Sequence, residues 1–127
     1  MKTCFRKIDL SNSLTVQVYD TTRRYYEDYH LVRLEIECEV AVKEEFFAEP
    51  ETFARARILL GESVRYQRTV EKMGVPFAEI AAARDEMLAC FSSTALPYIS
   101  SEIFPRKFVL SEVQKVSDAM RRSAVRW

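Results

Sequence analysis

The sequence predicts an α+β fold, with a small antiparallel sheet at the N-terminus followed by helices that pack on one face of the sheet. Over the first third of the chain, apolar residues alternate with polar ones, a period of two that is typical of strands with one buried face. Beyond Glu45 the apolar residues recur at every third or fourth position, as in an amphipathic helix. The connections between the strand patterns are short, which favours antiparallel pairing because parallel strands need a long crossover.

The predicted sheet is a three-stranded meander over about residues 3–10, 13–23 and 28–42. The third strand has the clearest alternation. Its apolar positions form one series: Val32, Leu34, Ile36, Cys38, Val40 and Val42. The polar positions between them are Arg33, Glu35, Glu37 and Glu39. One face of this strand should therefore be buried and the other solvated.

Three or four helices are expected, over about residues 50–73, 76–96, 98–104 and 112–124. Pro50 and Pro76 each suit the first turn of a helix, where a missing N–H costs nothing. Gly74 is the expected stop of the first helix. Ser111 and Gln114 have the spacing of a capping box at the start of the last one. The pattern leaves open how residues 97–110 pack.

Length and composition predict one globular domain over residues 1–127 that contains no membrane span. The 19 basic and 19 acidic residues give a net charge of zero, which argues against a large non-specific nucleic-acid surface. The cysteines, Cys4, Cys38 and Cys90, are widely spaced and form no C-x-x-C motif. The N-terminus has no apolar segment of a secretion signal, so we expect a soluble cytoplasmic protein. In that setting we expect the cysteines to be reduced, mostly buried thiols.

The residue inventory argues against catalysis. His30 is the single histidine, so a catalytic triad or a two-histidine zinc site cannot be built. Gly61 and Gly74 cannot form a phosphate-binding loop. The row of glutamates on the third strand does not converge on one point, as metal ligands must. We therefore predict a non-catalytic protein with no metal or cofactor.

The stretch YDTTRRYYEDYH, residues 19–30, lies between two strand patterns and should form the end of a hairpin. Because no glycine is present, we expect a loop longer than two residues. Tyrosine and arginine dominate binding hot spots, so this end is the candidate interaction surface. Its residues are Arg23, Arg24, Tyr25, Tyr26, Tyr29 and His30. The alternative is structural, with the tyrosines forming cross-strand pairs and His30 bonding a strand neighbour.

Three functions remain open. The first is a protein-interaction or assembly module, expected to form a homodimer through exposed sheet edges and to bind another protein as a further option. The second is a nucleic-acid binder that uses the arginines and tyrosines of the hairpin with the basic segment 106–127. The third is a small-molecule binder or enzyme with a pocket near His30, Glu35 and Tyr66.

Charge is also segregated along the chain. Residues 35–51 contain seven acids against one lysine, whereas residues 106–127 contain six basic residues against two acids. Opposed patches suit head-to-tail contact between copies or pairing within one molecule. Trp127 at the end of the sequence could be docked or exposed.

Overall fold

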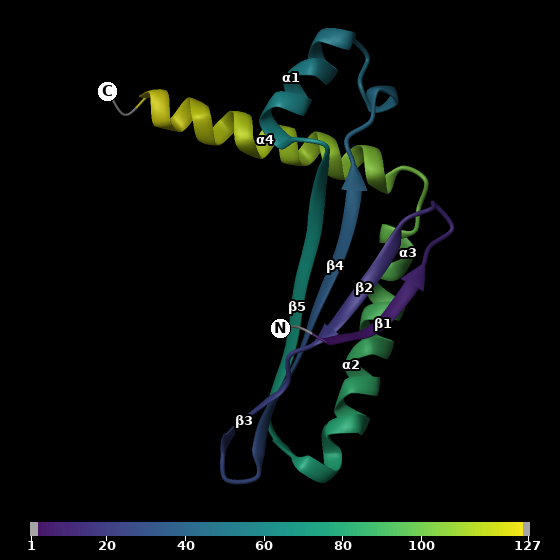
Figure 1. Cartoon of the computed structure of the whole chain (residues 1–127), viewed down its shortest axis with the longest axis vertical. Helices are drawn as coiled ribbons and strands as arrows, with labels where there is room; N and C mark the ends of the chain where they lie inside the picture. The colour runs from purple at the N-terminus through teal and green to yellow at the C-terminus, as the bar shows by residue number, and fades with distance from the viewer. Residues whose placement is uncertain (1–2, 126–127) are drawn as a thin grey trace. The chain divides into compact units, whose positions relative to one another are not determined.

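The fold is α+β, as predicted: an antiparallel sheet of five strands with an N-terminal meander, and four α-helices (Figure 1). The computed structural model describes residues 3–125, so Trp127 lies outside the described residues. The strands are β1 (Thr3–Asp9), β2 (Thr15–Asp20), β3 (Arg23–Tyr26), β4 (Tyr29–Ala41) and β5 (Ser63–Pro76). The helices are α1 (Pro50–Leu60), α2 (Ile80–Thr94), α3 (Leu96–Ile99) and α4 (Phe104–Val125), with two 3₁₀ turns, η1 (Glu44–Phe46) and η2 (Phe77–Glu79).

The chain forms two compact units. The first contains the residues up to Cys38 and Tyr66–Ser101, and the second contains Glu39–Arg65 and the residues from Glu102 onward. The long strands β4 and β5 each contribute residues to both units. The prediction of one domain over residues 1–127 stays a prediction.

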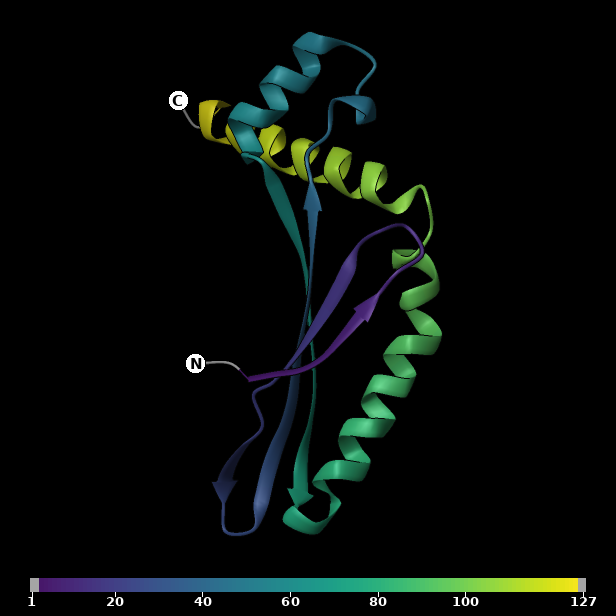
Figure 2. The ribbon, with the colours of Figure 1, turned by 45° about the vertical axis from the view of Figure 1, so that its right-hand side comes forward.

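In the first unit β4 is the central strand, with β2 and β3 on one edge and β5 on the other. The predicted alternation is confirmed, because Val32, Leu34 and Ile36 are at most 1% exposed. Helix α2 covers this face of the sheet (Figure 2), and its Ala83 packs with Val32 and Val75 in one core cluster. Burial of each large aliphatic side chain stabilises the fold by about 1.5–3 kcal/mol.

Strands β2 and β3 are two parts of the predicted strand 13–23. The pairing of β2 with β4 runs from Val16↔Cys38 to Asp20↔Leu34, and β3 resumes at Arg23↔Leu31 without any change of register. The interruption lies at residues 21–22. The meander of the sequence prediction is therefore confirmed, with a break in its second strand.

The predicted helix 50–73 is wrong beyond Leu60. Helix α1 ends at Gly61, whose φ of 83° lies in the left-handed region, and the chain then continues as β5. The helical period did fit residues 63–73, but so does a period of two. Half-buried Val64, Tyr66 and Val70 lie an even number of positions apart there, as on one face of a strand, with exposed Arg68 between the last two. The segment forms a strand because the edge of β4 is free to pair with it, and main-chain hydrogen bonds to β4 satisfy its backbone N–H and C=O groups.

The other helices differ from prediction at their ends. The segment 76–96 begins as η2 before α2. The predicted helix 98–104 is wrong over residues 100–103, because the single turn α3 ends at Ile99 and α4 begins at Phe104. The predicted start at residue 112 is wrong, because α4 begins at Phe104 and Pro105 occupies its first turn. Ser111 is therefore inside a helix and does not cap one. Phe104 and Val109, near the start of α4, are buried. This burial explains why the helix begins before the capping residues that the sequence analysis chose.

In the second unit α4 contacts both α1 and η1 (Figure 1). The buried residues of this unit include Ala56 of α1, Val42 after β4, and Phe104 and Val109 of α4. The side chains of Arg57 and Glu62 form an ion pair of 3.7 Å across the end of α1. The strongly polar outer face of α4 is consistent with a helix that is buried on one side only.

Burial raises the pKa of the Cys38 thiol to about 11, so this group stays protonated at neutral pH. Cys4 and Cys90 are exposed free thiols. The expectation of mostly buried thiols is therefore wrong for these two. Cys4 precedes a bulge in β1 at Phe5, and Cys90 lies on the outer side of α2.

The turn between β1 and β2 caps the end of α3. The side-chain amide of Asn12 donates hydrogen bonds to the carbonyls of Ile99, at 2.7 Å, and Ser101, at 2.9 Å. The Ser11 hydroxyl donates to the Ser100 carbonyl at 3.1 Å. The last carbonyls of a helix have no partner inside the helix, so these side chains satisfy groups that would otherwise be left unbonded.

Asn12→Ala should lower the free energy of unfolding by about 1–3 kcal/mol, because it leaves two partly buried carbonyls without donors. Ser11→Ala, at an exposed hydrogen bond, should cost less than about 1 kcal/mol. Urea unfolding of both variants measures the difference. Equal stability of Asn12→Ala and the wild type would show that the turn does not hold α3.

Candidate interaction site at the hairpin tip

The hairpin tip, residues 23–30, ends in a two-residue turn at Glu27 and Asp28. Arg24 pairs with His30 and Tyr26 with Tyr29, so Tyr25 is an extra residue in the ladder. The prediction of a longer loop is wrong. Glu27 adopts a φ of 46°, the left-handed conformation that a glycine usually supplies in a tight turn.

Aromatic side chains at the tip remain exposed. Tyr26 is 62% exposed and its cross-strand partner Tyr29 is 45% exposed, so the pairing that the structural alternative requires does not bury them. The hydroxyl of Tyr25 lies beside Gly74 of β5, only 3.9 Å from where a Cβ atom would be at that glycine. Phe77, at the start of η2, is 73% exposed.

Backbone contacts fix the tip against β5 and the start of η2. The backbone N–H of Phe77 donates to the Asp28 carboxylate at 3.4 Å. His30 Nδ1 lies 2.9 Å from the Asp28 carbonyl and 3.2 Å from the Val75 carbonyl. Both carbonyls can only accept, so Nδ1 is the donor in these two contacts. His30 thus bonds its neighbours, as the structural alternative for this residue predicted.

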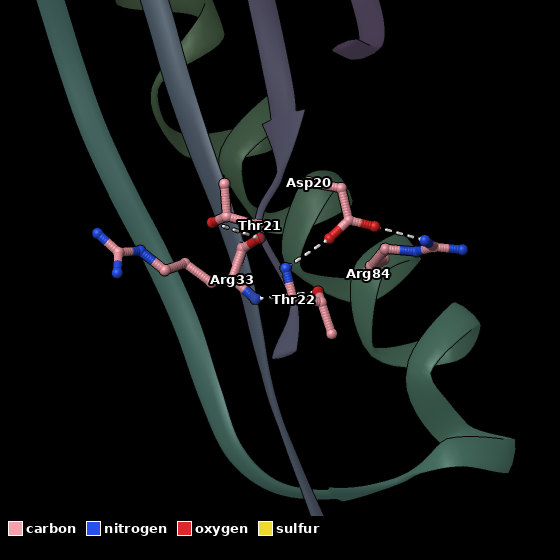
Figure 3. A network of polar contacts seen from close by, with 5 residues as sticks. All are labelled: Asp20, Thr21, Thr22, Arg33 and Arg84. Carbon is pink, nitrogen blue, oxygen red and sulfur yellow. Dashed lines mark hydrogen bonds and ion pairs between the residues drawn. The ribbon is translucent and has the colours of Figure 1, made fainter. Parts of the chain in front are cut away.

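Side chains hold the strand break above the tip (Figure 3). The Thr21 N–H donates to the Arg33 carbonyl at 2.9 Å, which continues the pairing of β2 with β4. The Arg33 N–H donates instead to a side chain, the Thr22 hydroxyl, at 3.2 Å. The Thr22 N–H donates to the Asp20 carboxylate at 2.9 Å. A short polar side chain that bonds the backbone two residues later is a turn-forming device, and here it bends the strand.

The Asp20 carboxylate also ties this break to α2. The Arg84 guanidinium donates to it at 2.6 Å (Figure 3). Arg84 Cζ also lies 4.9 Å from the centre of the Phe5 ring. Only 17% of the Asp20 side chain and 28% of the Arg84 side chain are exposed. Burial alone would raise the pKa of Asp20, but hydrogen bonds from Thr22 and Arg84 outweigh it and hold the pKa below 3.8. The pair is therefore ionised at neutral pH.

A hollow of about 600 Å³ opens beside the tip. We call it the tip hollow, and define it by its lining residues: Asp20, Thr22, Arg23, Arg24, His30, Phe77, Ala78, Ile80, Ala81 and Arg84. The sheet supplies most of the polar groups, and the start of α2 with η2 supplies the apolar ones. Three arginines face one aspartate, and that aspartate is already paired with Arg84. Such a lining favours an anionic group attached to an apolar body.

The tip hollow joins some of the predicted site residues and adds others. Arg23, Arg24 and His30 line it, whereas the three tyrosines are exposed and do not belong to its lining. Sequence reasoning missed Asp20 and Arg84. The Asp20-x-Thr22 spacing could have indicated a turn in the strand, but nothing in the sequence relates Asp20 to a residue 64 positions later.

Of the residues His30, Glu35 and Tyr66 named for a pocket, the tip hollow is lined by His30 alone. Alternation along β4 places His30 on the helix-covered side and Glu35 on the opposite face of the sheet. On that opposite face Glu37 accepts from Gln67 Nε2 at 3.2 Å and Glu39 accepts from the Ser63 hydroxyl at 2.7 Å. The glutamate row is therefore part of a solvated, hydrogen-bonded sheet face.

Two basic residues of the segment 106–127 are partly neutralised. Lys115 pairs with Glu112 and Arg121 with Asp118, each at 3.8 Å along α4. Among residues 3–125 no group of three or more histidine, cysteine or acidic side chains is placed to hold a metal ion. Within the same part of the chain, no helix is long and apolar enough to cross a membrane.

Asp20→Asn should lower the free energy of unfolding by about 2 kcal/mol at about pH 7, because Arg84 is left largely buried without a counter-charge. Since the folded pKa of Asp20 is lowered, its stabilisation is complete above the unfolded value of 3.8 and is lost as the pH falls through the folded value. The gap between variant and wild type should therefore shrink between about pH 5 and pH 2.

Urea unfolding across this pH range measures the gap. Asp85→Asn, at an exposed position next to Arg84 on α2, is the matched control and should change stability by less than about 0.5 kcal/mol. A gap for Asp20→Asn that is constant with pH would contradict the ionised pair.

Comparison of the chain with protein-family models, with curated proteins and with solved structures gave no match. The function must therefore be inferred from the residues of the site itself.

Proposed function

We propose that this chain is a non-catalytic protein-interaction module that binds its partner through the hairpin tip. The observation that carries the proposal is the group of exposed aromatic side chains around the tip. Tyr26 and Tyr29 face each other across the hairpin, and Phe77 packs beside His30, with its ring centre 6.1 Å from that of His30. Large aromatic side chains that stay exposed beside arginines are typical of binding hot spots.

The tip is also held in place before any partner arrives. Asp28 bonds the backbone of Phe77, His30 bonds two carbonyls, and Asp20 bonds both Thr22 and Arg84. Binding to an ordered surface loses less conformational entropy than binding to a flexible loop. The ordered hairpin tip therefore supports a role in partner recognition better than a role as a turn that only reverses the chain.

Nucleic acid is the alternative partner. Arg23 and Arg24 next to Tyr25 and Tyr26 could stack on unpaired bases. The apolar lining that Phe77 and Ile80 give the tip hollow favours protein over a phosphate backbone. The proposed setting is the cytoplasm, where the exposed thiols of Cys4 and Cys90 would stay reduced.

Tyr26→Ala with Phe77→Ala should abolish partner binding, because the double change removes two of the most exposed aromatic side chains at the tip. Immobilised full-length chain is compared with this variant by quantitative capture from cell extract. The matched control is Ile58→Ala with Met120→Ala, which removes apolar side chains of 84% and 55% exposure from the second unit.

Proteins retained by the wild type and the control but lost from the tip variant are the expected result. Equal retention by all three chains would contradict the proposal. Retention of nuclease-sensitive material alone would replace it with the nucleic-acid alternative.

We also propose that the chain associates with itself through β5. This strand spans 14 residues and pairs with β4, and no other described strand covers its second edge. An uncovered edge offers main-chain groups to a strand of a second copy. Sedimentation velocity at micromolar concentration should give a dimer mass, and a monomer mass at the highest attainable concentration would contradict this.

A further inference from the structure

We infer that the tip hollow binds an acidic side chain of the partner, an aspartate or glutamate that lies next to an apolar residue in the partner's chain. This inference rests on the proposed function, since it names the chemistry of the group that the tip recognises. It goes beyond the exposed aromatic surface because it assigns a ligand group to the adjoining hollow, whose lining shares Phe77 with that surface.

The charge of the lining selects an anion. Arg23 and Arg24 are exposed at the rim and have no carboxylate facing them within the lining, since its single aspartate, Asp20, is bonded to Arg84 and to the Thr22 N–H. A guanidinium matches the geometry of a carboxylate with two parallel hydrogen bonds. His30 Nδ1 already bonds two carbonyls, so its Nε2 is the ring nitrogen that remains for a ligand.

The balance of charge favours a single carboxylate over a polyanion. Glu27 and Asp28 lie exposed in the turn next to the hollow, and Glu79 is exposed at the end of η2. These acids would repel a chain of phosphates that extended beyond the hollow. A single carboxylate bound in the hollow does not extend to these acids.

The apolar part of the lining favours a carboxylate that has an apolar residue next to it in the partner's chain. Phe77, Ala78, Ile80 and Ala81 form one side of the hollow, and all but Ile80 are exposed. A partner side chain next to the acid would cover them and remove their apolar surface from water. Because most of the lining is exposed, the hollow is open, and a continuous main chain can lie across it without ending there. The occupant is therefore an internal acidic residue and not a chain terminus.

The test uses His30 as a reporter, because it is the single histidine of the chain and gives one set of imidazole signals in NMR. Acetyl-Glu-Phe-amide is titrated into the full-length protein. Its neutral twin, acetyl-Gln-Phe-amide, tests the charge; acetyl-Gln-Phe with a free C-terminus tests the source of the carboxylate. A short oligothymidylate tests the nucleic-acid alternative.

The glutamate dipeptide should shift the His30 signals saturably, and the glutamine twin should leave them in place. Arg23→Ala with Arg24→Ala should weaken binding of the glutamate dipeptide at least about tenfold, as the loss of a charged hydrogen bond predicts. Arg55→Ala with Arg106→Ala removes the same charge from exposed positions in the second unit and should leave binding unchanged. Both arginines of the tip variant are exposed, so its fold can be verified by its urea transition.

The inference is overturned if the glutamine twin binds equally, if the dipeptide causes no shift, or if the tip variant binds as the wild type does. Tighter binding of the free C-terminus or of the oligothymidylate also overturns it. The result is independent of partner capture: dipeptide binding without a captured protein would remove the proposed function but keep the site. Capture without dipeptide binding would do the reverse.

Discussion

The bond between Asp20 and Arg84 is the contact on which the candidate site depends. It connects a break in the sheet to the helix that covers the sheet, and it does so with two charges that are mostly withdrawn from water. On one side Asp20 also bonds the Thr22 N–H, so the bend of the strand and the position of α2 are set by the same carboxylate. Without that carboxylate, the arginines of β3 and the start of α2 would lose one of the contacts that fix their relative position, beside those of Asp28 and His30.

The rest of the first unit follows from the alternation along β4. Its buried side chains face α2, while its glutamates face solvent and bond side chains of β5. Because each residue of a strand points opposite to the next, the same alternation puts His30 on the side of α2. The proposed interaction surface is thus the end of an ordinary amphipathic sheet, formed by a short hairpin.

Much of this could be predicted from the sequence. The run from Val32 to Val42 has so clear a period that both its strand and its buried face were predictable, and the arginines and tyrosines of residues 23–29 identified the tip. Residues 63–73 were predicted wrongly because Val64 and Val70 fit a helical period as well as a strand period. Only the open edge of β4, a tertiary feature, separates the two. The partner of Asp20 could not be predicted, since it depends on where α2 packs.

A double-mutant cycle tests the central claim most directly. Asp20→Asn, Arg84→Met and the double variant are unfolded in urea at about pH 7, and the coupling free energy is taken from the departure from additivity. If the two side chains hold the strand break to the helix, the coupling should be about 1–3 kcal/mol, and the double variant should be more stable than the sum of the single changes predicts. Additive effects of the two substitutions would contradict the account.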